Sequence, residues 1–289
     1  MTVHVPVLVD EILEHLPLAP DAIVLDGTLG GGGHAARFLS TIGPAGRIIG
    51  FDRDPQAVAE TQARIADDRL IPFVANYADA PEVLKSMGIE QVDAILLDLG
   101  LSSDQLADRE RGFSYHSSGD LDLRFNPLQG EPASRLVNRL SEKHLADLIY
   151  QYGEERFSRR IARQIIKQRQ TQKIETAADL AELLRRSVPR SKNHDIDPAT
   201  RTFQALRIAV NEELKWLKVA IERLPHLLKP GGRIGVISFH SLEDRIVKHG
   251  LLESNSLNVI TKKPIKATDE EISANPRSRS AKLRVAEKT

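Results

Sequence analysis

Short apolar runs alternate with helical patterns over the first part of the chain. Runs rich in aliphatic and β-branched residues predict strands, and apolar positions at helical spacing predict helices between them. The expected strands are 23–25, 47–51, 70–74 and 92–97, and the expected helices are 34–40, 55–66 and 81–87. A β-α-β order of this kind implies right-handed crossovers and a parallel sheet. The pattern therefore predicts an α/β fold with a doubly wound sheet.

The alternation stops after Gly100 and returns near residue 212. Residues 105–211 show helical periodicity without a convincing strand, which predicts an inserted helical domain. The outer domain is then discontinuous and consists of residues 1–104 and 212–289. Its second part is expected to hold a helix at 212–228, a turn at 229–232, a strand at 233–239, a helix at 242–252 and edge strands at 257–260 and 281–285. Residues 266–280 are polar and rich in turn formers, and they predict an exposed loop.

The amino-acid composition indicates the class of protein. The 289 residues are 41% hydrophobic and 28% charged, which is typical of a soluble globular enzyme. The chain has no cysteine, which excludes a disulfide framework and a thiolate metal site and indicates an intracellular protein. No segment has the pattern of a signal peptide or the apolar length of a membrane span. The expected location is the cytoplasm, with no membrane partner.

A glycine-rich loop follows the first expected strand and opens the first expected helix. Within residues 26–35, Gly30, Gly32 and Ala35 match the spacing G-x-G-x-x-A. Glycines let the backbone approach a ligand closely, and the helix N-terminus presents free N–H groups. A merely flexible turn is the alternative, but the setting favours a site for a nucleotide-like ligand.

Three aspartates decide which ligand is expected. Asp52 ends the second strand, where a carboxylate can accept hydrogen bonds from ribose hydroxyls, and this alone fits both an NAD-dependent oxidoreductase and a methyltransferase. Asp26 precedes the glycines and Asp98 ends the fourth strand. Negative charge there suits an ammonium and sulfonium ligand better than a pyrophosphate. Asp98 could instead be a solvated or capping residue.

Long strings in the sequence resemble the RsmH (MraW) family of small-subunit ribosomal RNA cytosine-N(4) methyltransferases. The strings are 26–34, 98–106 and 238–245, supported by 4–11, 111–114, 153–157, 200–207 and 275–280. The resemblance implies a class I, Rossmann-like S-adenosylmethionine-dependent methyltransferase sheet with a helical domain inserted after the fourth strand. It also implies S-adenosyl-L-methionine as the cofactor and small-subunit ribosomal RNA as the partner, in an assembled or nearly assembled subunit.

The resemblance also assigns cofactor-binding residues by position. Asp52 is implied as the ribose ligand and Tyr77 as the residue near the adenine, although Tyr77 could equally be a core residue. The remaining implied contacts are Gly32, Gly33 and His34 at the methionine part of the cofactor, and Asp98 and Gln105 elsewhere.

Catalysis is expected to depend on Asp98 and His240. Amino methyltransferases commonly carry an Asp/Asn-Pro-Pro-aromatic string after the fourth strand, and here residues 98–101 read Asp-Leu-Gly-Leu. The acid is retained, so Asp98 is expected to accept a hydrogen bond from the cytosine amino group. The aromatic ring is not retained, and Phe113, Tyr115 and Phe239 are equivalent candidates to stack on the base. His240 is expected to line the same pocket, with a helix-capping role as the alternative.

A basic segment in the insertion predicts the RNA contact. The chain carries 40 basic and 40 acidic residues, yet residues 156–173 contain no acid. On a helix through this segment Arg156, Arg160, Arg163 and Lys167 share one face, opposite an apolar stripe. We expect this basic face to bind RNA phosphates. An ordinary solvated surface is the alternative, with Arg277, Arg279 and Lys282 as a second RNA path.

Two other classes of function fit the sequence less well. A noncatalytic RNA-binding protein would need a degraded pocket, whereas the three aspartates are all present. A metal-dependent enzyme is not indicated, because the nine histidines show no ligand spacing. The sequence does not distinguish a monomer from a homodimer.

Overall fold

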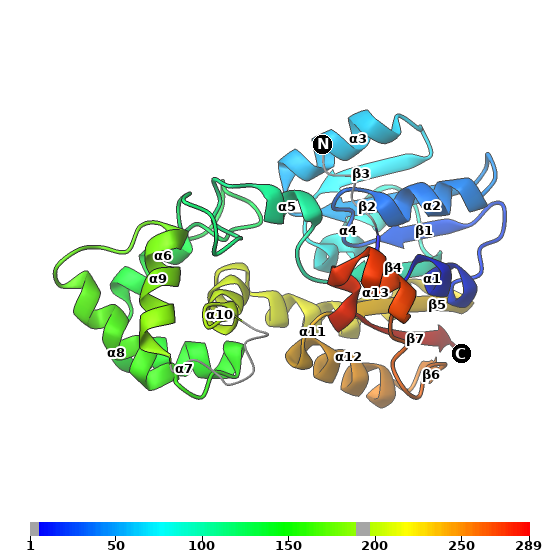
Figure 1. Ribbon diagram of the computed structural model, residues 1–289. Coiled ribbons are helices and arrows are strands. Elements are labelled where there is room, and N and C mark those ends of the chain that lie inside the picture. Colours follow the sequence, from blue (N-terminus) through cyan, green and yellow to red (C-terminus); the bar gives the residue numbers. More distant parts are fainter. Residues whose placement is uncertain (1–5, 189–196) are drawn as a thin grey trace. The chain divides into compact units, whose positions relative to one another are not determined.

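The computed structural model describes residues 6–188 and 197–289 (Figure 1). His4 and Val5 of the string 4–11 lie outside the described residues. The chain divides into two compact units. The first unit is Met1–Ser102 with Leu214–Thr289, and the second unit is Ser103–Glu213. The domain limits expected from sequence, 104/105 and 211/212, lie two residues from these divisions at each end.

The first unit is built on a seven-stranded sheet in the order β3-β2-β1-β4-β5-β7-β6. Its strands are β1 (Ile23–Asp26), β2 (Arg47–Asp52), β3 (Leu70–Val74), β4 (Val92–Asp98), β5 (Leu228–Ser238), β6 (Leu257–Val259) and β7 (Lys282–Lys288). Strands β1 to β5 pair in parallel, whereas β7 is antiparallel to both β5 and β6. The predicted doubly wound α/β fold is confirmed. Strand order reverses between β1 and β4, and ligands of open α/β sheets bind at the carboxyl ends beside such a switch point.

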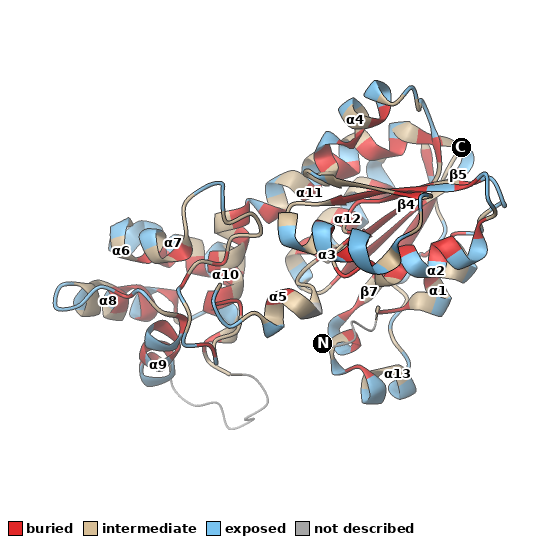
Figure 2. Ribbon diagram, turned by 90° about the horizontal axis from the view of Figure 1, so that it is seen from above, coloured by how far each residue is buried: buried red, intermediate tan, exposed pale blue. Residues whose placement is uncertain are grey.

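Helices cover both faces of this sheet (Figure 1). One face carries α1 (Val9–His15), α2 (Gly33–Thr41) and α3 (Pro55–Ile65), and the other carries α4 (Ala80–Ser86), α11 (Glu213–Arg223) and α12 (Ser241–Glu253). Figure 2 shows the strands as buried ribbon between these layers. Val24 and Leu25 are both fully buried, yet they belong to different core clusters, because successive side chains point to opposite faces of a strand. A sheet buried on both faces explains why the expected strands read as continuous apolar runs.

The region around the fifth strand differs from the prediction. The helix expected at 212–228 ends at Arg223 and continues as the 3-10 turn η2 (Leu224–Leu227). The turn expected at 229–232 lies inside β5, which begins at Leu228. Gly231 has φ +78°, and the pairing of β4 with β5 shifts register at this point. Glycine therefore allows the strand to continue through an irregularity that reads as a turn in the sequence.

The prediction of an exposed loop at residues 266–280 is wrong. This segment forms α13 (Asp269–Ala274) and the 3-10 helix η3 (Pro276–Ser280). Thr268 caps α13 by accepting a hydrogen bond from the backbone N–H of Glu271 at 3.2 Å. Asn275 and Ser278 are buried, with Ser278 donating to the carbonyl of Asn275 at 2.9 Å. The polar residues that suggested a loop are instead used in capping and in buried turns.

The regular elements of the second unit, over its described residues, are helices, and residues 108–132 form a long non-helical connection between two of them. Its helices are α5 (Ser103–Ala107), α6 (Ala133–Arg139), α7 (Glu142–Gly153), α8 (Ser158–Arg169), α9 (Ala177–Ser187) and α10 (Thr200–Asn211). Helix α7 packs against α8 and α10, and each of the three contributes fully buried aliphatic side chains. In neither unit does the described part of the chain contain a helix that combines the length and the apolarity needed to cross a bilayer.

Candidate functional site

Three aspartates meet at one edge of the sheet in the first unit. Asp26 ends β1, Asp52 ends β2 and Asp98 ends β4. These strands are neighbours and run parallel, so their carboxyl ends lie at the same edge. The arrangement expected from the sequence pattern therefore brings all three carboxyl groups to the switch point of the fold.

The glycine-rich loop leaves β1 and wraps around these carboxylates. The backbone N–H of Gly30 donates to Asp52 Oδ2 at 2.8 Å, and the N–H of Thr28 donates to Asp26 Oδ1 at 3.2 Å. Gly32 is the N-cap of α2 with φ +63°, a conformation that favours glycine. A Cβ on Gly32 would lie 2.5 Å from Cγ2 of Thr61, so no larger residue fits. Gly33 is the first residue of α2.

Helix α3 holds the loop from behind, a feature that sequence reasoning missed. The hydroxyl of Thr61 donates to the carbonyl of Gly30 at 2.7 Å, and Arg64 donates to the carbonyl of Gly31. Thr61 and Arg64 are three residues apart and therefore share one face of the helix. The two carbonyl groups are satisfied by α3, which leaves the loop with a defined shape.

Burial changes the acid–base behaviour of the three aspartates. Desolvation raises the pKa of Asp26 to about 6, partly offset by the nearby His34. Desolvation also raises the pKa of Asp52 to about 6, although Asp52 Oδ1 accepts a hydrogen bond from the N–H of Asp54 at 2.9 Å. The pKa of Asp98 rises to about 7, through burial and the negative charge of Glu243.

These shifts link the site to stability and to ligand charge. Each folded-state pKa lies above the unfolded value of about 3.9, so the folded chain holds more protons than the unfolded chain between about pH 4 and 7. The free energy of unfolding therefore falls as the pH rises through this window. Ionisation of buried carboxylates is unfavourable without a compensating charge. The site is thus suited to a ligand that carries positive charge and donates hydrogen bonds.

Asp98 has the most unusual surroundings of the three. Its backbone N–H donates to Thr28 Oγ1 at 2.6 Å, and Oδ2 lies 3.5 Å from Nδ1 of His34. Oδ1 is buried and has no hydrogen-bond partner within the described part of the chain. A buried polar atom without a partner is costly, and such atoms are uncommon outside functional sites. The free oxygen is therefore a candidate contact for a ligand.

Tyr77 lies beside the base of the glycine-rich loop. It opens the 3-10 helix η1 (Tyr77–Asp79), which follows β3. A Cβ on Gly27 would lie 3.0 Å from the Cβ of Tyr77 and 2.3 Å from Cδ2 of Leu97, so the loop passes close to this residue. Tyr77 is half-buried and also packs against the core cluster. Core packing and a position next to a ligand therefore coexist.

Gln105 and two of the candidate aromatic residues belong to the second unit. Gln105 is buried in α5. Phe113 stacks on Phe125 with ring centroids 6.1 Å apart, and Tyr115 makes an edge contact with Phe203 at 6.0 Å. Phe113 and Tyr115 thus have ring partners inside their own unit.

Phe239 is the candidate aromatic residue in the unit that holds the carboxylates. Gly100 has φ +106°, and a Cβ there would lie 3.2 Å from Cδ2 of the Phe239 ring. The ring therefore packs against the backbone of the string 98–101. The N–H of Leu99 donates to the carbonyl of Ile237 at 3.0 Å, which fixes the string beside the end of β5.

His240 caps helix α12. Its Nδ1 accepts a hydrogen bond from the N–H of Glu243 at 3.4 Å, while Glu243 Oε2 accepts from the N–H groups of Phe239 and His240 at 2.8 and 3.3 Å. This reciprocal pair is a capping box. The structure therefore gives His240 the structural role that the sequence left open, and Nδ1 is committed to it. Nε2 is buried, lies 3.0 Å from Glu243 Oε1 and is not aligned for a hydrogen bond with it.

The basic face of the second unit differs in part from the prediction. Helix α8 begins at Ser158, so Arg156 lies before the helix, with its guanidinium 4.7 Å from the ring of Phe157. The prediction of one continuous helix from residue 156 is wrong, because the N-terminal residues 156–157 form the turn into it. Ile161 and Ile165 are fully buried, so the apolar stripe packs inward as predicted.

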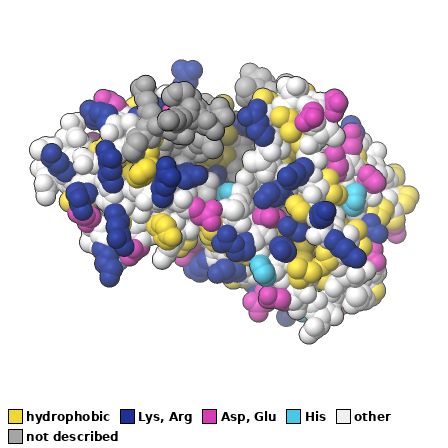
Figure 3. Space-filling view, turned by 60° about the horizontal axis from the view of Figure 1, so that its bottom comes forward, with side chains coloured by type: hydrophobic (Ala, Val, Ile, Leu, Met, Phe, Trp, Pro, Cys, Tyr) yellow, Lys and Arg dark blue, Asp and Glu magenta, His cyan; other side chains and the backbone are white. Residues whose placement is uncertain are grey.

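The charged side chains of α8 lie on the opposite face. Arg160, Arg163 and Lys167 are exposed. Arg163 forms an ion pair with Glu142 of α7 at 3.5 Å, which local sequence could not reveal. Over residues 6–188 and 197–289, Arg160 and Lys167 have no ion-pair partner. Figure 3 shows that lysine and arginine side chains are frequent on one face of this unit.

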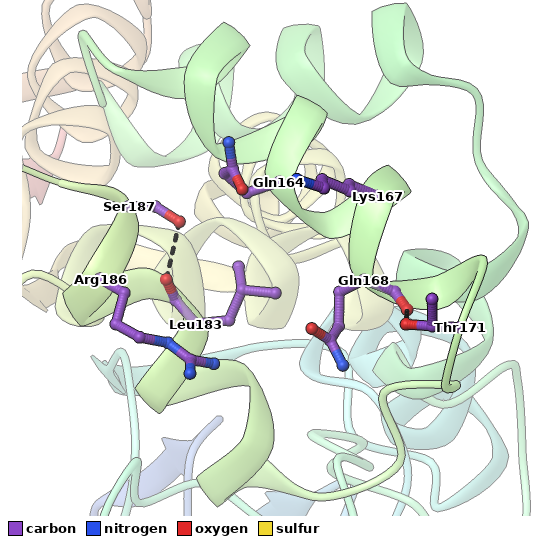
Figure 4. Close-up of a pocket in the computed structure, with 7 residues that line it drawn as sticks. All are labelled: Gln164, Lys167, Gln168, Thr171, Leu183, Arg186 and Ser187. Carbon is purple, nitrogen blue, oxygen red and sulfur yellow. Dashed lines mark hydrogen bonds between the residues drawn. The ribbon is translucent and has the colours of Figure 1, made fainter.

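A pocket of about 340 Å³ opens between α8 and α9 in the second unit (Figure 4). Its lining is mostly polar, and Lys167 of the basic face contributes to it. The lining residues are Gln164, Lys167, Gln168, Thr171, Leu183, Arg186 and Ser187. The hydroxyl groups of Thr171 and Ser187 donate to helix carbonyls at 2.8 and 2.7 Å, and Arg186 forms an exposed ion pair with Glu182 at 3.3 Å. The two glutamine amides and Lys167 are therefore the polar groups most available to a ligand.

Across the part of the chain that the structure describes, no three His, Asp or Glu side chains come together as a metal site would require.

Comparison with known proteins gives the family. The family model described as the MraW methylase family matches residues 1–289. The chain is 50% identical over 298 residues to "Ribosomal RNA small subunit methyltransferase H" of Rhodopirellula baltica, which covers 99% of this chain and 92% of the relative. It is 51% identical over 285 residues to the protein of the same name from Deinococcus radiodurans, covering 99% and 89%. A crystal structure of an rRNA methylase from Streptococcus thermophilus is 12% identical, with a TM-score of 0.45, and the match covers 96% of this chain and 92% of that chain.

The match over the full length of the chain and the identity near one half agree with the resemblance of the sequence strings. The expectations of a class I sheet and of S-adenosylmethionine as the cofactor are thereby confirmed. The chain belongs to the MraW methylase family of S-adenosylmethionine-dependent methyltransferases.

Proposed function

We propose that the protein transfers a methyl group from S-adenosylmethionine to the exocyclic N(4) amino group of a cytidine in small-subunit ribosomal RNA. The observation that carries the proposal is Asp98 Oδ1, a buried acceptor without a partner in the described residues at the end of β4. The names of the 50% and 51% identical relatives support the RNA class of the substrate.

The residues at the switch point fit the cofactor. S-adenosylmethionine, when bound, supplies a methyl group on a positively charged sulfur. Asp52 would accept hydrogen bonds from the ribose hydroxyls, and Asp26 and Asp98 would balance the positive charge. Tyr77 would pack near the adenine. The methionine part would lie against Gly32, Gly33 and His34, and Gln105 of the second unit is proposed as a further contact.

Asp98 is the proposed catalytic residue. The lone pair of a cytosine amino nitrogen is conjugated into the ring, so the amino group is a weak nucleophile. A hydrogen bond from its N–H to Asp98 Oδ1 would localise the lone pair and orient it for in-line transfer. Phe239, which packs against Gly100 beside this oxygen's strand, is the proposed stacking partner of the base.

We propose an indirect role for His240, which is to position other residues. Its Nδ1 caps α12, so its contribution to catalysis is to hold Phe239 and Glu243 beside the end of β5. Only the buried Nε2 could contact a substrate.

An NAD-dependent oxidoreductase is disfavoured by the same observations. Three carboxylates at the strand ends, of which Asp26 is buried and the other two are half-buried, would repel a pyrophosphate, whose negative charge needs N–H donors and cations. The family membership also separates the chain from that class.

The direct test of the proposal is the chemical identity of the product. Unmethylated small ribosomal subunits, and the RNA extracted from them, are incubated with the protein and isotope-labelled S-adenosylmethionine. Digestion to nucleosides and mass spectrometry against standards is expected to show label in N(4)-methylcytidine. Label in C5-methylcytidine or in another nucleoside would contradict the proposed acceptor atom. Comparison of the two substrates also tests the proposed preference for an assembled or nearly assembled subunit.

The RNA is proposed to run over the basic face of the second unit, which consists of Arg156, Arg160, Arg163 and Lys167. A target base must leave its stack to reach a buried site, so the flanking strand needs phosphate contacts. The pocket between α8 and α9 adds Arg186 and two glutamine amides next to Lys167. Phosphate contacts of this kind hold the strand without reading its sequence.

Replacing Arg160, Arg163 and Lys167 by glutamine is expected to weaken RNA binding and leave cofactor affinity unchanged. The dependence of log affinity on log salt should flatten by about 0.7 for each phosphate of single-stranded RNA that the protein no longer neutralises. Fluorescence anisotropy with a labelled RNA at several salt concentrations measures both quantities.

The matched control removes the same charge elsewhere in the second unit. Arg135, Arg139 and Lys143 are exposed on α6 and α7 and are not among the residues of the proposed face. Their replacement by glutamine should change the salt dependence less than the α8 variant does. If RNA affinity and its salt dependence survive the α8 changes, the basic face is ordinary solvated surface, and Arg277, Arg279 and Lys282 become the path to test.

A further inference from the structure

A series of contacts within the first unit leads from the C-terminal helix α13 to Asp98. Glu271 Oε1 accepts a hydrogen bond from the backbone N–H of Leu8 at 2.9 Å, across 263 residues of sequence. One residue earlier, the carbonyl of Val7 lies 2.9 Å from Nε2 of His34. The other ring nitrogen of His34 lies 3.5 Å from Asp98 Oδ2. We propose that Glu271 is a positioning residue that orients His34 against Asp98 through the backbone of Val7 and Leu8.

Glu271 is well placed to act as a fixed support. Helix α13 is capped by Thr268, and the segment that carries it is attached to the sheet at its start. Ile265 and Leu283 of β7 exchange two backbone hydrogen bonds of 2.9 Å. At the other end of the segment Ser278 is fully buried. Movement of Glu271 is therefore restricted by β7, a strand in the interior of the sheet.

Leu8 needs such a support. Its φ is +55°, in the left-handed region that residues other than glycine rarely adopt, and its side chain is fully buried. It is the N-cap residue of α1, and its side chain makes no capping hydrogen bond. The bond from its N–H to Glu271 is charge-assisted and therefore among the stronger kinds of hydrogen bond. Loss of this bond would release the backbone of Val7 and Leu8 from its present position.

The position of the Val7 carbonyl determines which ring nitrogen of His34 carries the hydrogen. A carbonyl oxygen only accepts, so the hydrogen of a neutral His34 ring lies on Nε2, and Nδ1 presents its lone pair to Asp98. The contact between Nδ1 and Asp98 Oδ2 then requires a proton on one of the two groups. Because Oδ2 contacts His34, Oδ1 remains available to the amino group that accepts the methyl group. The inference rests on the proposed function of His34 and Asp98 in the cofactor and acceptor site.

The charge of Glu271 also reaches His34. Burial lowers the pKa of His34, whereas the negative charges of Asp26 and Glu271 raise it. Asp98 of β4 also faces the His34 ring. Burial and the negative charge of Glu243 raise the pKa of Asp98. Removal of the Glu271 charge should therefore lower the pKa of His34 even where the hydrogen bond to Leu8 is kept.

The test compares Glu271→Ala, Glu271→Gln and, as the matched control, Glu270→Ala, which alters an exposed neighbour on the same helix. Calorimetric titration of the full chain with S-adenosylmethionine measures affinity. Glu271→Ala is expected to raise Kd about tenfold, the effect of one charge-assisted hydrogen bond, whereas Glu271→Gln keeps an acceptor for Leu8 and should stay within about threefold of the unaltered chain. Glu270→Ala should match the unaltered chain.

The second readout is the His34 ring itself, observed by NMR on protein with ¹⁵N-labelled imidazoles and identified by its loss in His34→Gln. In the unaltered chain and in Glu271→Gln the hydrogen should stay on Nε2, with a lower His34 pKa in Glu271→Gln. In Glu271→Ala the two tautomers should mix. An unchanged His34 spectrum in Glu271→Ala, or a loss of affinity that Glu271→Gln does not restore, would overturn the proposal. Should Glu271→Ala fail to fold, Glu271→Asp takes its place, because its shorter side chain withdraws the carboxylate from the N–H of Leu8, and an unchanged His34 spectrum in Glu271→Asp would overturn the proposal. Because this readout needs no RNA, its failure is distinguishable from a failure of the proposed function.

Discussion

Replacement of Asp52 by alanine is expected to weaken the binding of S-adenosylmethionine by about 2 to 3 kcal/mol, which corresponds to a Kd about 30- to 150-fold higher. Two effects contribute. The proposed ribose hydroxyls lose their charged acceptor, and the N–H of Gly30, which donates to Asp52 Oδ2 at 2.8 Å, loses the partner that shapes the loop. Calorimetric titration at about pH 7.5, above the raised pKa of Asp52, measures the change.

The same titration carries a pH signature. The pKa of Asp52 is raised to about 6, and hydrogen bonds from the ribose would lower it on binding. Binding near pH 6 should therefore release protons, and affinity should fall as the pH drops through this value. Titrations in two buffers of different ionisation enthalpy count the protons released, and Asp52→Ala should release fewer.

Asp68→Ala serves as the control, because Asp68 is an exposed acid between α3 and β3. It should bind the cofactor as the unaltered chain does. Equal affinity for Asp52→Ala and Asp68→Ala would remove Asp52 from the cofactor site.

The positions of the three site aspartates could be predicted because strand ends follow from local pattern. Buried parallel strands read as apolar runs, and the polar residue that ends each run lies at the carboxyl edge of the sheet. Asp26, Asp52 and Asp98 each end such a run. The glycine-rich loop is equally local, since a tight turn between a strand and a helix demands glycine at positions such as Gly32.

Contacts between distant segments could not be predicted in this way. The bonds from Thr61 and Arg64 to the loop join residues more than thirty positions apart, and the bond from Leu8 to Glu271 joins residues 263 positions apart. Helical periodicity indicates which face of α3 is buried but not which carbonyl it meets. The ion pair between Arg163 and Glu142 could not be predicted for the same reason.

The structure of residues 266–280 could not be predicted for a different reason. Threonine, serine, asparagine and proline favour turns, and they also cap short helices. Local composition does not separate the two, and only the attachment of Ile265 to Leu283 and the burial of Ser278 show that this segment is ordered packing against the sheet. His240 was ambiguous in the same manner, because a side chain that caps a helix also lies at the end of β5.

Asp98 is the residue on which the proposed chemistry depends, and its variants should differ in the rate of the chemical step. Asp98→Ala removes the buried acceptor that is proposed to orient the cytosine amino group, and it is expected to slow methyl transfer by about 100-fold or more. Asp98→Asn should lie between Asp98→Ala and the unaltered chain. Its amide group can donate to Nδ1 of His34 in place of a protonated carboxyl, which leaves one oxygen as an acceptor, but the negative charge is lost.

The decisive measurement is the single-turnover rate of methyl transfer to small-subunit RNA, with cofactor and RNA at saturating concentrations so that binding defects do not enter. Glu90→Ala, which alters an exposed acid just before β4, is the matched control and should react at the normal rate. We predict that the rates fall in the order unaltered chain, Asp98→Asn and Asp98→Ala, with the last about 100-fold down. A normal single-turnover rate in Asp98→Ala would contradict the proposed role of this carboxylate.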